Sequence, residues 1–196
     1  HRRMAPRERR NIRPLLRPLD ELARGSDRLF AAHLGYSDAR GLPQSMPKYL
    51  FTGPGDRRSY LRVGIFAGIH GDEESGVLAA VEFLERLHAR PELARGYEVF
   101  VYPICNPEGF TDNTRWSRSG RDLNREFWQD SAEPEVQALE RQLDQLRFDG
   151  LIALHSDDTS DGLYGFVKGH ELTRHVLEPA LKSAGIILPR NFDKSI

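Results

Sequence analysis

Two histidines and one glutamate in this chain of 196 residues have the types and the order of a metal site. His70 and Glu73 stand at the two ends of the stretch H-G-D-E, and His155 lies much later, in the stretch L-H-S. A catalytic zinc ion takes three protein ligands from histidine, glutamate and aspartate, and it leaves a fourth position for water. We therefore expect one metal ion at these residues, with metal-assisted hydrolysis as the chemistry.

Each part of this pattern also has a plainer interpretation. An H-x-x-E pair is often only a contact between neighbours on the protein surface, and Asp72 and Glu74 flank Glu73, so the sequence leaves the choice of carboxylate open. For His155, the alternative is an ordinary histidine of the core or of a loop. The pattern becomes a metal site only if the fold brings the two histidines together.

An arginine-rich stretch lies between the two parts of the pattern. It follows the stretch N-P-E-G, and it holds Asn124 and four arginines within eleven residues: Arg115, Arg118, Arg121 and Arg125. One interpretation is a solvated basic loop. The other is recognition of a carboxylate, for which the planar guanidinium group is the suited donor. Composition alone does not separate the two.

Buried strands are expected to position the histidines. Residues 60–69, 97–104 and 150–154 are apolar and have high β-propensity, which predicts three buried strands. Helical patterns separate them, so we predict an α/β sheet with helices on both faces. Both histidines follow a predicted strand directly, and ligands of such sheets gather at the carboxyl ends of the strands. This placement favours the metal interpretation.

Periodicity predicts the other elements. Apolar residues over 19–30 recur at helical spacing, and Gly35 is a suitable end for that helix. Residues 41–55 are rich in glycine, proline and serine and predict a loop. Asp130 and Glu133 form a capping-box pattern before a helix that carries on one side Val136, Leu139, Leu143 and Leu146.

The two ends of the chain are predicted to differ in order. Residues 1–18 are polar and contain several prolines, which predicts a poorly ordered lead-in, and we assign residues 19–196 to a single domain. Within that domain, residues 172–184 are predicted to be helical and strained near Pro179.

Bulk properties narrow the class of protein. The net charge of −1 gives no reason to expect a nucleic acid or an anionic membrane as partner. No apolar run is long enough to span a membrane or to act as a secretory signal. The one cysteine, Cys105, excludes an internal disulfide and fits a reducing compartment, so we expect a cytoplasmic protein.

The ordered set H-G-D-E, N-P-E-G, R-x-x-x-x-G-R-D-L-N-R and L-H-S resembles the zinc-carboxypeptidase family and its relatives, the succinylglutamate desuccinylases and aspartoacylases. The resemblance runs from about Leu61 to Tyr164. It implies a three-layer α/β/α fold with a mixed, mostly parallel sheet, and one zinc ion held by His70, Glu73 and His155. Carboxypeptidase A is a known example of this ligand set, so the set is not an independent prediction.

The same resemblance implies roles for the arginine-rich stretch. Arg115 corresponds to the residue that polarises the scissile carbonyl and stabilises the oxyanion. Arg118 is a candidate substrate-binding residue, and it is a rival for the role of Arg115 if the loop slips by one turn. Asn124 and Arg125 match the pair that holds the terminal carboxylate of the substrate. Asp122 falls where the family places an acid that orients a histidine ligand.

The implied reaction is hydrolysis of an amide or peptide bond next to a free carboxylate by metal-activated water. The expected partner is accordingly a peptide or an acylated amino acid with a free carboxylate. The glycine of N-P-E-G and the spacing from Arg115 to Gly120 favour the peptidase branch. The alternative enzyme is a deacylase of N-acyl amino acids.

The family also uses a glutamate as general base, from a strand well beyond the third zinc ligand. After His155 the chain offers Glu171 and Glu178, both inside the last predicted helix, and we assign neither. We therefore expect the chain to lack the C-terminal part of the catalytic domain. The alternative from another class is a non-catalytic module that binds metal or peptide.

Three aspartates follow His155 closely: Asp157, Asp158 and Asp161. A polar turn is the plainer interpretation. The functional hypothesis is that these acids favour a substrate that bears an amine.

Overall fold

The computed structural model describes residues 8–38, 40–157 and 162–185. The chain divides into two units, residues 1–156 and 157–196, and each is described by itself. The assignment of residues 19–196 to a single domain stays a prediction.

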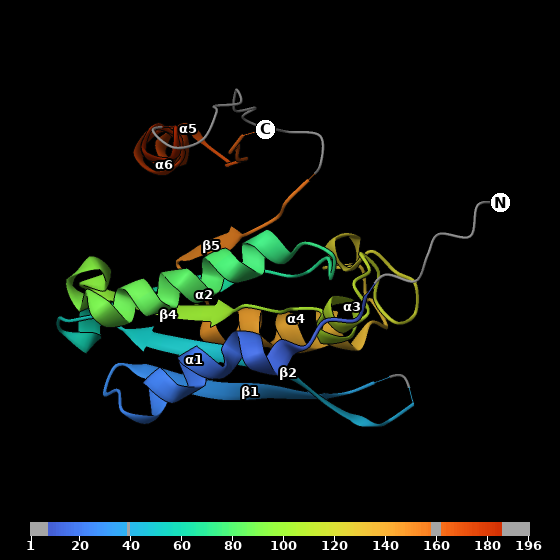
Figure 1. The fold of residues 1–196 in the computed structure, drawn as a ribbon. Helices are drawn as coiled ribbons and strands as arrows, with labels where there is room; N and C mark the ends of the chain where they lie inside the picture. Colours follow the sequence, from blue (N-terminus) through green and yellow to red (C-terminus); the bar gives the residue numbers. More distant parts are fainter. Residues whose placement is uncertain (1–7, 39, 158–161, 186–196) are drawn as a thin grey trace. The chain divides into compact units, whose positions relative to one another are not determined.

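Among the described residues, five strands of the first unit form one sheet, in the order β1-β2-β4-β3-β5 (Figure 1). β1, β2 and β4 are antiparallel neighbours, whereas β4, β3 and β5 run parallel. The carboxyl ends of the three parallel strands therefore lie on one edge of the sheet. The strands are β1 (Leu29–Ser37), β2 (Pro43–Thr52), β3 (Leu61–Phe66), β4 (Tyr97–Tyr102) and β5 (Gly150–Ala153).

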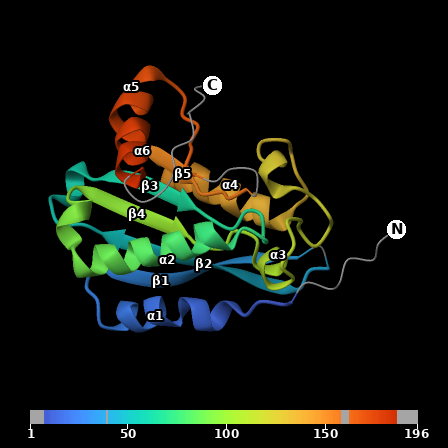
Figure 2. The same ribbon diagram turned by 45° about the horizontal axis from the view of Figure 1, so that its top comes forward.

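Helices cover both faces of this sheet, and Figure 2 shows the layers. α1 (Ile12–Arg24) and α2 (Glu74–Ala89) pack on one face, and α4 (Pro134–Leu146) packs on the other. β4 supplies both cores by alternation, with Val99 and Val101 on the α1–α2 side and Phe100 and Tyr102 on the α4 side. The predicted α/β/α fold with a mixed sheet is confirmed. Short elements complete the unit: η1 (Arg57–Ser59), η2 (Pro91–Ala94), α3 (Pro107–Thr111) and η3 (Leu123–Arg125).

The three predicted strands are confirmed as β3, β4 and β5, but the prediction that β5 is buried is wrong, because it lies at the edge of the sheet and most of its residues are exposed. The elements near the start of the chain also differ from prediction. Residues 12–18 are not a poorly ordered lead-in, because they form the first turns of α1, whose Leu16 and Leu19 are buried. Residues 1–7 lie outside the described residues. The helix expected over 19–30 ends at Arg24, since Leu29 already begins β1.

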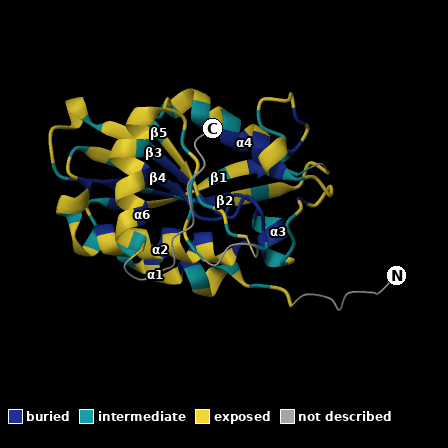
Figure 3. Cartoon of the chain, turned by 90° about the horizontal axis from the view of Figure 1, so that it is seen from above, coloured by how far each residue is buried: buried dark blue, intermediate teal, exposed yellow. Residues whose placement is uncertain are grey.

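Residues 41–55 are not a loop, because β2 occupies residues 43–52. Its Met46, Tyr49 and Phe51 are buried, and β2 pairs with β1 along nine residues of the hairpin. The glycines, prolines and serines of this segment suggested turns, but pairing with two neighbouring strands overrides that local preference. Figure 3 colours the chain by burial: most of β4 is buried, whereas most of β1, at the edge of the sheet, is exposed.

The helix predicted after residue 133 is confirmed as α4, but its capping box is not formed. Glu133 occupies the N-cap position without a side-chain capping bond. Its carboxylate instead accepts a hydrogen bond from the Ser119 hydroxyl. Glu133 therefore ties the arginine-rich stretch to the start of α4.

In the second unit, the predicted helix over 172–184 is divided. It consists of α5 (His170–Leu172), a wider π-helical turn η4 (Thr173–Leu177) and α6 (Glu178–Ala184). The wide turn ends at Leu177, two residues before Pro179, whose ring and missing N–H disfavour a regular α-helix in the preceding turn. Among the described residues of the whole chain, no helix has the length and apolar character that a membrane crossing requires.

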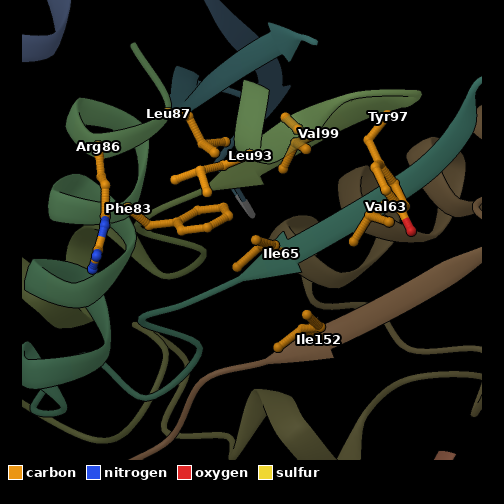
Figure 4. Close-up of a pocket in the computed structure, with 10 residues that line it drawn as sticks. Val63, Ile65, Phe83, Arg86, Leu87, Leu93, Tyr97, Val99 and Ile152 are labelled. Carbon is orange, nitrogen blue, oxygen red and sulfur yellow. The ribbon is translucent and has the colours of Figure 1, made fainter. Parts of the chain in front are cut away.

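The outer edge strand β5 is more exposed than its neighbours. Leu151 and Ile152 are 57% and 43% exposed. Ile152 also lines an open apolar pocket beside β3 and β4, shown in Figure 4 with Phe83 of α2 and Leu93 of η2. None of the predicted metal ligands or substrate-binding residues lines this pocket.

A buried acid on α4, Glu135, provides a test of how the core on the α4 side of the sheet affects stability. Glu135 is 3% exposed, and burial together with the nearby charges of Glu108 and Glu133 raises its pKa above the ordinary value of 4.5. The folded protein therefore favours the neutral form of Glu135. The stability that this preference contributes is fully present below the pKa of Glu135 in the unfolded chain, and it is lost as the pH rises through its higher pKa in the folded protein. Glu135→Gln should raise the free energy of unfolding at pH 7 relative to the unsubstituted protein.

The difference should vanish near pH 4, where Glu135 is largely neutral in both states, and urea unfolding at a series of pH values measures it. Glu82→Gln, at an exposed position on α2, serves as control and should show no such dependence. A Glu135→Gln variant that is less stable at pH 7 than at pH 4, relative to the unsubstituted protein, would contradict this account.

Candidate metal centre and substrate loop

The turn of residues 70–73, called the metal turn below, follows β3 and leads into α2. It lies beside the end of β5, because the Leu154 N–H donates to the Phe66 carbonyl at 2.8 Å and continues the pairing of the two parallel strands. His155 follows directly. The carboxyl ends of β3 and β5 thus bring together segments that are separated by more than eighty positions in sequence.

The three predicted metal ligands lie together. His70 Nδ1 is 2.7 Å from Glu73 Oε1, and His155 Nδ1 is 3.0 Å from Glu73 Oε2. One ligand atom from each residue lies within 4.8 Å of the others. The Ser156 N–H also donates to Glu73 Oε2, at 3.2 Å, which fixes the carboxylate between the two histidines.

The donor atoms suit one small metal ion. Tetrahedral zinc with ligands at roughly 2.1 Å keeps its donor atoms about 3.4 Å apart, a separation close to that of this cluster. His70 and Glu73 are buried, whereas the His155 side chain is 32% exposed. Two of the predicted ligands are thus enclosed by the protein, and the third is accessible from solvent.

Mutual hydrogen bonds shift the pKa values of this cluster. Burial would raise the pKa of Glu73, but hydrogen bonds from His155 and His70 outweigh it and bring the pKa to about 2. Burial would lower the pKa of His70, but its hydrogen bonds with Glu73 and Asp122 outweigh burial and raise the pKa. Glu73 is therefore ionised at neutral pH, while metal binding competes with a proton on His70.

Asp122 connects the metal turn to residues 115–125, called the arginine loop below. Its Oδ1 is 2.9 Å from His70 Nε2, and its Oδ2 accepts from Arg115 Nη2 at 2.9 Å. Burial would raise the pKa of Asp122, but these two bonds outweigh burial and lower it. The structure thus places Asp122 against the ring nitrogen of His70 that points away from Glu73. A ligand-orienting acid occupies this position in many metal sites.

Arg115 rather than Arg118 lies at the cluster. Arg115 Nη1 is 3.8 Å from Glu73 Oε1 in addition to its bond with Asp122. Arg118 instead pairs with Glu108 in the N-P-E-G segment. The spacing in the sequence left these two arginines as rivals, and the contacts place only Arg115 beside the predicted ligands.

Asn124 and Arg125 lie in η3, whose N-cap is Asp122. Both side chains are exposed, and Arg125 Nε is 3.8 Å from Asp122 Oδ2. Arg125 therefore lies beside Asp122, and the side chains of both residues are accessible from solvent. Of the three aspartates that follow His155, Asp158 and Asp161 lie outside the described residues, and Asp157 accepts a hydrogen bond from Tyr164 within the second unit.

Two positioning features were not predicted from the sequence. Asn106 is fully buried, and its amide donates to the carbonyls of Ile69 (3.4 Å) and Trp116 (3.2 Å), so it joins the metal turn to the arginine loop. Gly71 lies so close to Gly109 that a Cβ on Gly71 would stand 2.0 Å from the Gly109 carbonyl carbon. The metal turn therefore packs directly against the backbone of the N-P-E-G segment. In the sequence, the signal for this close contact was the glycine in each of the two motifs.

Comparisons with known proteins show the family and the fold. Residues 59–188 match the family model of the succinylglutamate desuccinylase/aspartoacylase catalytic domain. Comparison with curated protein sequences gave no significant match. Several solved structures share the fold, all at low sequence identity.

A metallo-carboxypeptidase from Burkholderia cenocepacia is 20% identical with a TM-score of 0.71, and the match covers 94% of this chain and 52% of that one. A metallo-carboxypeptidase from Pseudomonas aeruginosa, in complex with (2-guanidinoethylmercapto)succinic acid, is 22% identical with a TM-score of 0.59, over 76% and 40% of the two chains. An aspartoacylase family protein from Mesorhizobium loti is 21% identical with a TM-score of 0.60, over 74% and 46%.

The chain therefore spans about half the length of these structures or less. At such identities the structures show a shared fold, whereas the family model covers most of the chain. Both kinds of relative that the sequence motifs suggested are among the matches. The chain belongs to the succinylglutamate desuccinylase/aspartoacylase family, whose catalytic domain it matches over residues 59–188.

Proposed function

We propose that the protein is a zinc-dependent hydrolase that cleaves an amide bond next to a free carboxylate. The supporting observation is that one carboxylate, Asp122, holds both His70 and Arg115, each at 2.9 Å. A group of metal donors and an anion-binding guanidinium are thereby fixed against each other. A solvated basic loop would not need this contact with the buried side of a metal cluster.

The donor set fits zinc. Two imidazoles and one carboxylate are the ligands of several catalytic zinc sites, and His70, Glu73 and His155 would hold the ion here. When bound, zinc would lower the pKa of a water molecule to roughly 7 and polarise the carbonyl group of the substrate. The hydrogen bond that the far nitrogen of His70 donates to Asp122 would keep that ring oriented.

The arginine loop would bind the substrate. The Arg115 guanidinium would meet the negative charge that develops on the carbonyl oxygen, and being held in place beforehand makes this stabilisation effective. Asn124 and Arg125 would bind the substrate carboxylate with charge-assisted hydrogen bonds. We assign the general base to no residue of this chain. The proposed turnover is therefore that of the whole protein, which would supply this base.

Two substrate classes agree with this site. The match with the desuccinylase and aspartoacylase family favours an N-acyl amino acid. The glycine of N-P-E-G and the spacing from Arg115 to Gly120 favour a peptide with a free C-terminus. A carboxylate next to the scissile bond is common to both, and the Pseudomonas aeruginosa relative was solved with a succinic acid derivative.

Metal binding is the first prediction. The protein should bind one zinc ion, and His155→Ala should weaken the affinity by at least about 100-fold, because one of three donors is lost. Chelator competition measures the affinity, and His33→Ala, at an exposed histidine of β1, is the matched control. Unchanged zinc affinity in His155→Ala would remove the proposed site.

The roles of the two rival arginines give a second prediction. Arg115→Ala should keep the bound zinc but lower kcat by about 100-fold to 1000-fold, as loss of one oxyanion donor does in other hydrolases. Arg118→Ala removes an arginine of the same loop that pairs with Glu108, and it should retain most of the activity. Equal losses in the two variants would show that Arg115 has no special role.

The substrate class is tested by comparing N-acyl amino acids with peptides that have a free C-terminus. Preferential hydrolysis of N-acyl amino acids is expected if the family match indicates the substrate, and preferential hydrolysis of peptides is expected if the loop motifs do. In either case, blocking the substrate carboxylate as an amide should raise KM strongly, because Arg125 and Asn124 lose their ionic partner. Tight zinc and peptide binding without turnover of either class would instead support a non-catalytic binding module.

A further inference from the structure

We propose that Arg10, which precedes α1, is a positioning residue for the metal turn. Its guanidinium holds the backbone between His70 and Glu73 in the conformation that directs both side chains towards one metal ion. This inference rests on the proposed metal site. It extends that proposal to a segment that lies before the residues matched by the family model, which begin at residue 59.

The guanidinium of Arg10 contacts the metal turn directly. Arg10 Nη1 donates to the Gly71 carbonyl at 2.9 Å, and Nη2 reaches the Asp72 carbonyl at 3.5 Å. The same Nη2 lies 3.8 Å from Glu74 Oε2 at the start of α2. Gly71 and Asp72 are the two residues between the ligands, so one planar fork contacts the whole intervening backbone.

The metal turn leads into α2 at a helix start that has no side-chain cap. Glu73 occupies the N-cap position of α2 but makes no side-chain capping bond, since its carboxylate is engaged by the two histidines. Within the turn, the Glu73 N–H donates to the His70 carbonyl and the Glu74 N–H to the Asp72 carbonyl, both at the long distance of 3.2 Å. An N-cap side chain normally accepts a hydrogen bond from an N–H of the first helical turn, and α2 begins without that acceptor. The bonds from Arg10 to the Gly71 and Asp72 carbonyls instead hold the turn that precedes the helix.

Arg10 is itself held on both sides. Its backbone N–H donates to the Thr111 carbonyl at 2.8 Å, and its guanidinium carbon lies 5.1 Å from the centre of the Phe110 ring. Directly after it, Asn11 caps α1 by accepting from the Arg13 N–H at 3.1 Å. The side chain is consequently fixed between α1 and the N-P-E-G segment, on which Gly71 also rests.

The neighbouring arginines of this segment behave differently. The Arg10 side chain is 20% exposed, whereas those of Arg9 and Arg17 are 74% and 75% exposed. Arg9 pairs with Asp112 and Arg17 with Glu21, and both pairs lie on the surface. An arginine that only kept the segment soluble would resemble these two, so the burial of Arg10 against the metal turn indicates a specific role.

The test uses Arg10→Ala and Arg10→Lys, with Arg9→Ala as the matched control. Arg10→Ala should weaken zinc affinity by about 10-fold to 100-fold, the usual effect of losing a group that orients ligands. Arg10→Lys should be intermediate, because an ammonium group can donate to one carbonyl but cannot span both. Arg9→Ala should bind zinc like the unsubstituted protein.

Hydrogen exchange in the metal-free protein supplies a readout that does not depend on zinc. In Arg10→Ala, amides of residues 70–76 should exchange faster, while those of β4 should keep their protection. Faster exchange throughout the first unit, or zinc affinity equal to that of the unsubstituted protein, would overturn the proposal and leave Arg10 as a general stabilising residue.

Failure of the metal site itself has a separate signature. In that case neither the unsubstituted protein nor His155→Ala binds zinc tightly, whatever residue stands at position 10. A protein that binds zinc through His155 with the same affinity in Arg10→Ala refutes the role of Arg10 alone.

Discussion

The parallel pairing of β3 with β5 is the constraint on which the candidate centre depends. Phe66 is aligned with Ala153, so both strands end at the same level of the sheet and release their chains on the same side. His70 and His155 follow these ends and meet at the carboxylate of Glu73. A slip of one residue in this register would turn the β5 side chains to the opposite faces and separate the histidines.

Around this pairing, a few buried polar groups join segments that are distant in sequence. Asp122 fixes the arginine loop to His70, and Asn106 fixes the metal turn to the same loop through two backbone carbonyls. Glu73 joins the two histidines instead of capping α2, and Arg10 contacts the turn that this leaves without a cap. The motifs, although separate in the sequence, are therefore joined by one network of hydrogen bonds, in which metal donors and anion-binding groups cannot move independently.

The sequence was sufficient for those parts whose signal is local. Parallel strands are short apolar runs, so β3, β4 and β5 could be predicted, together with the gathering of His70 and His155 at the ends of β3 and β5. The exposure of β5 could not, because it depends on the place of that strand at the edge of the sheet. The β1–β2 hairpin could not, because β1 is largely exposed and its apolar spacing mimics a helix. Arg115 could not be distinguished from Arg118 until Glu108 was seen to pair with the latter, and the role of Arg10 depends entirely on tertiary contacts.

The most direct measurement is a crystal structure of the protein with zinc, in which anomalous scattering locates the ion. One ion should lie about 2.0–2.2 Å from His70 Nδ1, from His155 Nδ1 and from a carboxylate oxygen of Glu73. His70 Nε2 should remain hydrogen-bonded to Asp122. Zinc bound at other residues, or coordinated by the Nε2 atom of His70 with Asp122 displaced, would contradict the proposed centre.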